Sequence, residues 1–190
     1  MGGTEKRRPF LAGVQDFAAV YGVRGPQVSQ WVTRGALTYE HAVIVSGSPY
    51  WLLSYVKEFG PARTRPKEPN ETVLDELVEQ QSPGWWAKSV GELPPIVGMQ
   101  ECEALFGVSQ RSLADRVGKG IWITPDYRLS GSPLWLLDTV LEAEPPASRT
   151  VQWVADPVVV AALRERRYEG PGSVIVPRGP AARKRADAEE

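Results

Sequence analysis

An internal repeat constrains this chain more than any other feature of its 190 residues. The octamer SGSPYWLL at 46–53 returns as SGSPLWLL at 130–137, with seven of eight residues identical. Upstream, LAGVQDFAAVYGV at 11–23 aligns with IVGMQECEALFGV at 96–108 at an offset of 85 positions, which becomes 84 at the octamer. The copies therefore differ by one residue in the loop between the two blocks. The sequence predicts a duplicated structural unit.

The repeat divides the chain into four regions. We expect copies at 10–59 and 95–144, a linker at 60–94 and a C-terminal region at 145–190. The linker begins with polar, proline-rich sequence and then places Val73, Leu74, Leu77 and Val78 at helical spacing, which predicts a short packing or dimerisation helix. In the last region, Asp156 and Pro157 predict the start of a helix that ends at Gly170, and the mixed basic and acidic residues beyond it predict a disordered tail.

Each copy has the pattern of two helices, a hairpin and a third helix. Apolar residues 14, 17, 18 and 21 lie on one helical face, and Gly22 suits a left-handed helix end. A second helix follows with Val28 and Trp31 buried, then strands at 42–45 and 50–51 flanking the turn SGSP, whose Trp51 anchors the hairpin. A third helix begins at Leu52. The predicted fold class is mostly α with small β-hairpin wings (α+β): two tandem winged helix-turn-helix units plus a C-terminal helix and tail.

The stretch VGMQECEALFGVSQRSLADRVGKG, followed by a hairpin and PLW, resembles the winged-helix domains of the MerR and excisionase-like superfamily. Such domains occur in bacterial regulators and in phage or plasmid recombination factors. The resemblance covers both copies, about 100 of 190 residues. It implies that the second helix of each copy enters the major groove and that the wing lies along the neighbouring backbone or minor groove.

The resemblance also implies which side chains contact DNA. They are Arg24, Gln27, Gln30 and Arg34 in copy one, and Gln110, Arg111, Ser112 and Lys119 in copy two. Arg suits guanine and Gln suits adenine, whereas Arg34 and Lys119, at the helix ends, are expected to hold phosphates. The wing residues are Ser46, Gly47, Ser48, Ser130, Gly131 and Ser132.

The chain departs from the superfamily pattern in three ways. Leu-Leu follows the wing Trp in both copies where family members often have a basic residue. In copy two, Asp115 lies on the expected DNA face and Arg116 replaces Trp31 of the buried stripe. Copy one has three Lys/Arg and three Asp/Glu, and copy two has four and seven. Copy one is therefore the expected DNA reader, and copy two is expected to bind weakly or to serve packing or partner contact.

Composition argues against an enzyme or a metal site. The single cysteine, Cys102, aligns with Phe17 on the predicted core face, and the single histidine, His41, has no second ligand at metal-binding spacing. No catalytic set, cofactor motif or membrane-spanning run is present, and the N-terminal residues lack a secretory signal pattern. We expect a cytoplasmic, nucleoid-associated protein without metal or cofactor.

Two functions remain open from the sequence. The first is sequence-specific binding of double-stranded DNA in a bacterium, phage or plasmid, as a transcription regulator or recombination directionality factor. Two linked readers would act bivalently and, on a flexible linker, would favour two half-sites in direct or loosely spaced orientation. The alternative is a protein-protein adaptor or assembly factor, favoured by a net charge of −1, the acidic second copy and the motif PGWW at 83–86. A protein partner, or self-association through the linker helix or C-terminal region, is compatible with either.

Overall fold

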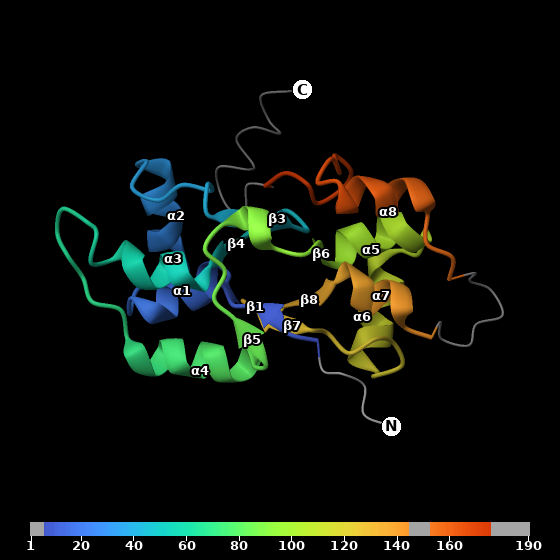
Figure 1. Cartoon of the computed structure of the whole chain (residues 1–190), viewed down its shortest axis with the longest axis horizontal. Coiled ribbons are helices and arrows are strands. Elements are labelled where there is room, and N and C mark those ends of the chain that lie inside the picture. The colour runs from blue at the N-terminus through green and yellow to red at the C-terminus, as the bar shows by residue number, and fades with distance from the viewer. Residues whose placement is uncertain (1–5, 145–152, 176–190) are drawn as a thin grey trace.

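The computed structural model describes residues 6–144 and 153–175 as a mixture of short helices and small, mainly antiparallel sheets (Figure 1). The predicted tail beyond 175 lies outside these residues. The first half contains β1 (Arg8–Pro9), β2 (Leu11–Ala12), α1 (Val14–Val20), α2 (Gly25–Thr33), β3 (Ala42–Val45), β4 (Ser48–Leu52), α3 (Leu53–Phe59), α4 (Glu71–Gln81) and β5 (Gly84–Trp85). The second contains the 3-10 turn η1 (Val90–Glu92), β6 (Ile96–Val97), α5 (Met99–Phe106), α6 (Gln110–Gly118), β7 (Tyr127–Leu129), β8 (Ser132–Leu136), α7 (Leu137–Glu142) and α8 (Pro157–Arg164).

The helical pattern of the sequence is confirmed in both copies. Phe17 and Cys102 are fully buried at equivalent positions of α1 and α5. Gly22 and Gly107 follow these helices with φ of +58° and +64°, the left-handed conformation that glycine adopts without a steric penalty. The third helix begins at Leu53, one residue later than predicted, because Leu52 still pairs with Leu11 in the sheet.

The repeated octamer forms a tight hairpin in each copy. Ser46 and Gly47 have φ of +47° and +72°, and Ser130 and Gly131 have +49° and +79°. Two successive positive φ values at the turn are the type I′ geometry, which matches the twist of the flanking strands. The predicted strand 42–45 is confirmed as β3.

The one-residue difference between the copies lies just before the hairpin. Trp51 Nε1 donates to the carbonyl of Thr38, 13 positions upstream, at 2.9 Å. Trp135 Nε1 donates to the carbonyl of Ile123, 12 positions upstream, at 3.1 Å. The indole therefore fixes the same loop in both copies, and the loop of the first copy accommodates one more residue.

Each copy has a three-stranded antiparallel sheet with two buried faces. The sheets have the orders β2-β4-β3 and β6-β8-β7. Along β4, Trp51 faces the helices of its own copy, whereas Tyr50 and Leu52 belong to a separate cluster at the centre of the molecule. Along β8, Trp135 faces its own helices, and the centre receives Leu134 and Leu136. Alternating side chains thus join each sheet to the other copy.

The central cluster makes the two copies one packed body. Its fully or nearly fully buried members come from both sheets and from the segment that connects them: Leu11, Val45, Tyr50, Leu52, Ala87, Leu93, Ile96, Tyr127, Leu129, Leu134 and Leu136. Burial of apolar surface on this scale strongly favours association. The sequence expectation of two units on a flexible tether therefore differs from the structure, in which the units are docked.

The two regions outside the aligned copies contribute equivalent helices. The N–H of Asn70, which caps α4, donates to the carbonyl of Val20 at 2.8 Å, and the N–H of Asp156, which caps α8, donates to the carbonyl of Leu105 at 2.8 Å. Val20 and Leu105 are equivalent positions of the repeat. Each unit therefore has a fourth helix packed on its first, so the linker helix has the packing role. Helix α8 begins as predicted but ends at Arg164, and Arg166 has φ of +57°.

Copy two has Arg116 where copy one has Trp31 on the buried face of the second helix, and each residue makes a cation–π contact with a residue outside its copy. In copy one, the Arg63 guanidinium carbon lies 4.7 Å from the ring centre of Trp31. In copy two, Arg116 occupies the position of Trp31, and its guanidinium carbon lies 5.4 Å from the ring centre of Trp153. The cation and the aromatic ring have changed places, so a similar cation–π contact is retained.

The copies are related by an approximate two-fold axis along the view of Figure 1. A half-turn about the centre of the picture exchanges α2 at the upper left with α6 at the lower right, and α3 with α7. The paired sheets lie between them. The second helices of the two units therefore lie at opposite corners of the molecule.

Candidate nucleic-acid interface

Helix α2 presents the four residues that the sequence predicts as DNA contacts of copy one. Arg24 is the N-cap and Arg34 the C-cap residue, and both are exposed. Gln27 is half-buried and Gln30 is exposed. Within the described residues, none of these four side chains forms a hydrogen bond or an ion pair of its own. Two cationic and two amide side chains are thus available to a ligand along one helix.

In helix α6, two of the four predicted DNA contacts already have side-chain partners within the fold. Gln110 Nε2 donates to Glu103 Oε2 at 2.7 Å, and Lys119 Nζ lies 2.8 Å from Asp115 Oδ2. Ser112 is half-buried, and its N–H donates to the capping hydroxyl of Ser109 at 3.4 Å. Arg111 is exposed and is the predicted contact of α6 without such a partner among the described residues. The second helix therefore offers less free charge and hydrogen-bonding capacity than the first.

The hairpin tips, predicted as DNA-contacting wings, are engaged within the molecule. The Ser130 hydroxyl oxygen accepts from the N–H of Gln15 at 2.9 Å, at the start of α1. The Ser46 hydroxyl oxygen accepts from the N–H of Gln100 at 3.0 Å, at the start of α5. Each hairpin thus caps the first helix of the other unit. We call these reciprocal contacts the hairpin clasp.

An acidic side chain completes each half of the clasp. The Ser130 hydroxyl donates to Asp16 Oδ2 at 3.0 Å, and the Ser46 hydroxyl donates to Glu101 Oε2 at 2.6 Å. The same carboxylates accept from the N–H of Gly13 at 2.9 Å and of Gly98 at 2.9 Å. Burial raises the pKa of Asp16 above its usual value, and the hydrogen bonds from Gly13 and Ser130 act in the opposite direction.

The remaining predicted wing residues lie in the same hairpins. Gly47 is buried, and its N–H donates to the carbonyl of Gly172 at 2.8 Å. Gly131 is exposed, whereas Ser48 and Ser132 are half-buried at the start of β4 and β8. Of the six residues, Ser46, Gly47 and Ser130 therefore make hydrogen bonds to the other unit. Their contact with DNA stays a prediction, and it would require surface that the clasp leaves open.

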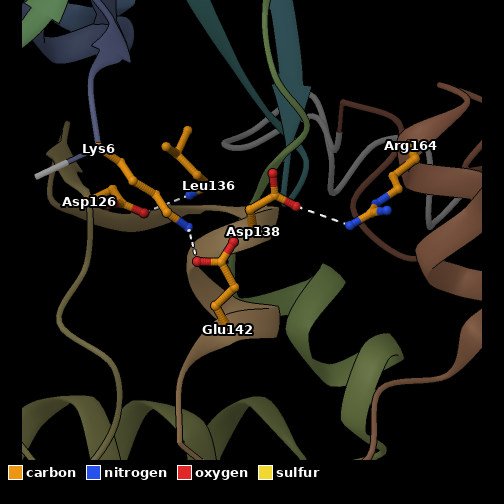
Figure 2. Close-up of polar contacts among 6 residues, drawn as sticks. All are labelled: Lys6, Asp126, Leu136, Asp138, Glu142 and Arg164. Carbon is orange, nitrogen blue, oxygen red and sulfur yellow. Dashed lines mark hydrogen bonds and ion pairs between the residues drawn. The ribbon is translucent and has the colours of Figure 1, made fainter. Parts of the chain in front are cut away.

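The excess of acidic residues in copy two is largely matched by contacts within the fold. Figure 2 shows Glu142 paired with Lys6 at 2.8 Å and Asp138 paired with Arg164 at 3.1 Å. Asp126 Oδ2 accepts from the N–H of Leu136 at 2.7 Å (Figure 2). Lys6 and Arg164 lie outside the aligned copy, so the charge count of copy two alone overstated its acidity.

The single Cys and the single His have packing roles. Cys102 is fully buried, and burial raises the pKa of its thiol well above the usual range. The His41 ring stacks on Tyr55 with ring centres 4.4 Å apart. In the described part of the chain, no three His, Cys, Asp or Glu residues converge as a metal site would require.

Two further surface features bear on function; the sequence pointed to the first through the motif PGWW and did not point to the second. Trp86 is 43% exposed and lies edge-on to Phe10, with ring centres 5.4 Å apart, whereas Trp85 packs against the central cluster. A basic hollow of about 710 Å³ lies beside the end of α2 and includes Arg63, Arg65 and Lys88. The basic run RTRPK at 63–67 is the sequence feature that could have indicated the hollow, but its composition is typical of a linker.

Comparisons with known proteins add no information on the function of these features. No protein-family model matches the chain, and neither the curated proteins nor the solved structures give a match to it. None of the helices among residues 6–144 and 153–175 has the length and apolar character needed to cross a bilayer.

Proposed function

We propose that this chain binds double-stranded DNA in a sequence-specific manner through two winged helix-turn-helix units, in the cytoplasm of a bacterium or in a phage or plasmid context. It would act as a transcription regulator or a recombination directionality factor, with no metal, cofactor or catalytic step. The observation that carries the proposal is helix α2. Arg24, Gln27, Gln30 and Arg34 line it, and their side chains form no hydrogen bond or ion pair with the described residues, whereas Gln110 and Lys119 of α6 are paired.

The chemistry of these four residues suits base and phosphate contacts. Arg can donate two hydrogen bonds to guanine, and Gln can exchange two with adenine, for about 1–3 kcal/mol of discrimination each. Residues 27, 30 and 34 are spaced to share one helical face, which is how a helix reads successive base pairs in the major groove. Arg34, at the helix end, suits a contact with a phosphate.

The docking of the units favours binding to two half-sites, with the units arranged about an approximate two-fold axis and differing in their strength of binding. Two units related by an approximate two-fold axis would meet half-sites in inverted orientation, on one duplex or on two. Lys119 and Gln110 of α6 are engaged by Asp115 and Glu103, so the second half-site would contribute less. The proposal therefore replaces directly repeated half-sites with an inverted pair of unequal strength.

Selection of binding sequences from a random duplex pool tests this function. Wild-type protein should enrich a motif, Arg24→Ala should relax one half of it, and Arg111→Ala should relax the other half by less. Truncation of the second unit is a poor test, because it would remove the cap on α1 and expose the central cluster. Absence of any enriched motif at about 50 mM salt, where phosphate contacts are strong, would refute sequence-specific binding.

A role as a protein-protein adaptor is the second candidate, and Trp86 favours it. A large aromatic ring that is 43% exposed beside Phe10 is the kind of residue that anchors protein interfaces. Trp86→Ala should then abolish partner binding while leaving duplex affinity unchanged. Protein that shows no duplex affinity at any salt, but retains a Trp86-dependent partner, would support this role over DNA binding.

A further inference from the structure

The basic hollow lies between helix α3 and the segment that follows α2. Tyr55 and Phe59 of α3 form part of its lining, with Ala36 and His41 on one side. Arg63 and Arg65 line it from the loop between α3 and α4, and Lys88 lines it from the segment before η1. The hydroxyl of Ser54, in the first turn of α3, donates to the carbonyl of Ala87 at 2.6 Å, which fixes the segment that carries Lys88.

The hollow has a net positive charge. Its lining contains Arg63, Arg65 and Lys88 against one carboxylate, Glu58. Across residues 6–144 and 153–175, none of these three cations forms an ion pair, whereas the neighbouring Lys57 pairs with Glu71 at 3.4 Å. Cations that converge on an open hollow without acidic partners create a local positive potential that attracts anions.

The arginine nearest α2 is held in place by aromatic rings. The guanidinium carbon of Arg63 lies 4.7 Å from the ring centre of Trp31 and 5.4 Å from that of Phe59. A guanidinium stacked on its flat face keeps its N–H groups free at the edge, where they can bond two phosphate oxygens. Because Trp31 belongs to α2, this contact fixes the basic loop relative to the helix that carries the proposed base contacts.

The hollow adjoins the proposed DNA-contacting end of α2. Its lining begins at Ala36, two residues after Arg34, and the α3–α4 loop projects at the same end of the molecule as α2 (Figure 1). The hairpin of this unit is occupied in the clasp, and Leu-Leu follows Trp51. Apart from the phosphate contact proposed for Arg34, the unit would thus lack backbone contacts beside α2 unless another element supplied them.

We propose that the basic hollow binds the DNA backbone, with Arg63, Arg65 and Lys88 holding phosphates beside the site contacted by α2. This inference rests on the proposed DNA binding. The α3–α4 loop and Lys88 would make the contact with the DNA backbone that a free wing would otherwise make. An open hollow at the molecular surface suits a phosphate of an extended polymer. The hollow beside Trp153 in the second unit, of about 70 Å³, has Glu144 and neither lysine nor arginine among its described lining residues, so it does not offer the same phosphate contact.

The test measures binding of a selected duplex and of a scrambled duplex by fluorescence anisotropy across salt concentrations. The double variant Arg65→Ala/Lys88→Ala should lose about tenfold or more in affinity for both duplexes alike, because phosphate contacts carry no sequence information. The slope of log K against log salt should fall in magnitude by about 2, since about 0.9 is lost for each phosphate contact. Lys57→Ala, an exposed cation of α3 outside the hollow, is the matched control and should change neither quantity.

A conservative variant separates charge from shape. Arg65→Lys/Lys88→Arg keeps both cations and should retain most of the affinity and the salt slope. The inference is overturned if the double alanine variant behaves like Lys57→Ala while Arg24→Ala still weakens specific binding. It is also overturned if inorganic pyrophosphate binds the hollow and the double variant abolishes that binding without affecting either duplex. Wild-type protein that binds no duplex at any salt would instead refute the underlying DNA-binding function.

Discussion

The hydroxyl oxygen of Ser130 accepts a hydrogen bond from the N–H of Gln15 at 2.9 Å, across 115 positions of sequence. Ser46 makes the equivalent contact with Gln100 at 3.0 Å, in the opposite direction between the units. A serine in a left-handed turn thus caps a helix that belongs to the other copy. This relationship explains why the SGSP turn occurs twice with almost no change, since each copy needs the turn of the other.

Removal of either capping hydroxyl should lower stability. Ser130→Ala and Ser46→Ala each leave at least one helix N–H without its capping partner and remove one hydrogen bond to a carboxylate, so each should reduce the free energy of unfolding by about 1–2 kcal/mol. The effect of Ser46→Ala should be the larger, because Glu101 is almost fully buried. Urea denaturation measures both changes. Ser29→Ala, at an exposed position of α2, is the control and should change stability by only a few tenths of a kcal/mol.

The glycines before α1 and α5 should not tolerate a side chain. A Cβ at Gly13 would lie 2.4 Å from the hydroxyl oxygen of Ser130, and a Cβ at Gly98 would lie 2.4 Å from that of Ser46. Gly13→Ala or Gly98→Ala should therefore displace the hairpin and destabilise the protein by about 1–3 kcal/mol. Gly118→Ala has no atom within 4 Å of the new Cβ and should be neutral or slightly stabilising. Equal melting temperatures for all three variants would contradict the observed clasp.

Cys102 should report unfolding of the second unit. Burial raises the pKa of its thiol, so the native protein should react with iodoacetamide at pH 8 only through an open state populated at about 10⁻³ or less. Leu52→Ala removes apolar surface from the central cluster on the first unit, at a cost of about 2–5 kcal/mol. If the units unfold together, this variant should speed alkylation of Cys102 by about 30-fold or more. An unchanged alkylation rate, with the first unit destabilised, would show that the units unfold independently.

The acidic residue of α6 should limit DNA binding by the second unit. Asp115 aligns with Gln30 and pairs with Lys119 at 2.8 Å. Asp115→Gln removes a repulsive charge and frees Lys119, so duplex affinity should rise several-fold and the salt slope should steepen by about 1. Glu79→Gln on α4 makes the same change in net charge at an exposed site and is the control. Equal effects of the two variants would mean that net charge alone, rather than α6, governs affinity.

Local patterns in the sequence determined most of the secondary structure. The spacing of Val14, Phe17 and Tyr21 predicted α1, the residues Asp156-Pro157 predicted the start of α8, and SGSP predicted both hairpin turns. These features depend on interactions within about eight residues, such as helical periodicity, capping and positive φ at a turn. The buried positions of Phe17 and Cys102 followed from the same periodicity.

Only the tertiary structure shows that the two copies pack against each other and that each caps a helix of the other. Tyr50 and Leu52 alternate with Trp51 in a way that fits any half-buried strand, and nothing local shows that their face meets the sheet of the other copy. Ser46 and Ser130 likewise have the sequence of a free turn, because caps supplied from 54 and 115 positions away leave no periodic signal. The sequence places Arg63 in a linker, and only the structure shows that its loop packs against Trp31. Contacts between distant segments depend on how elements pack, and no local pattern in a single sequence shows that packing.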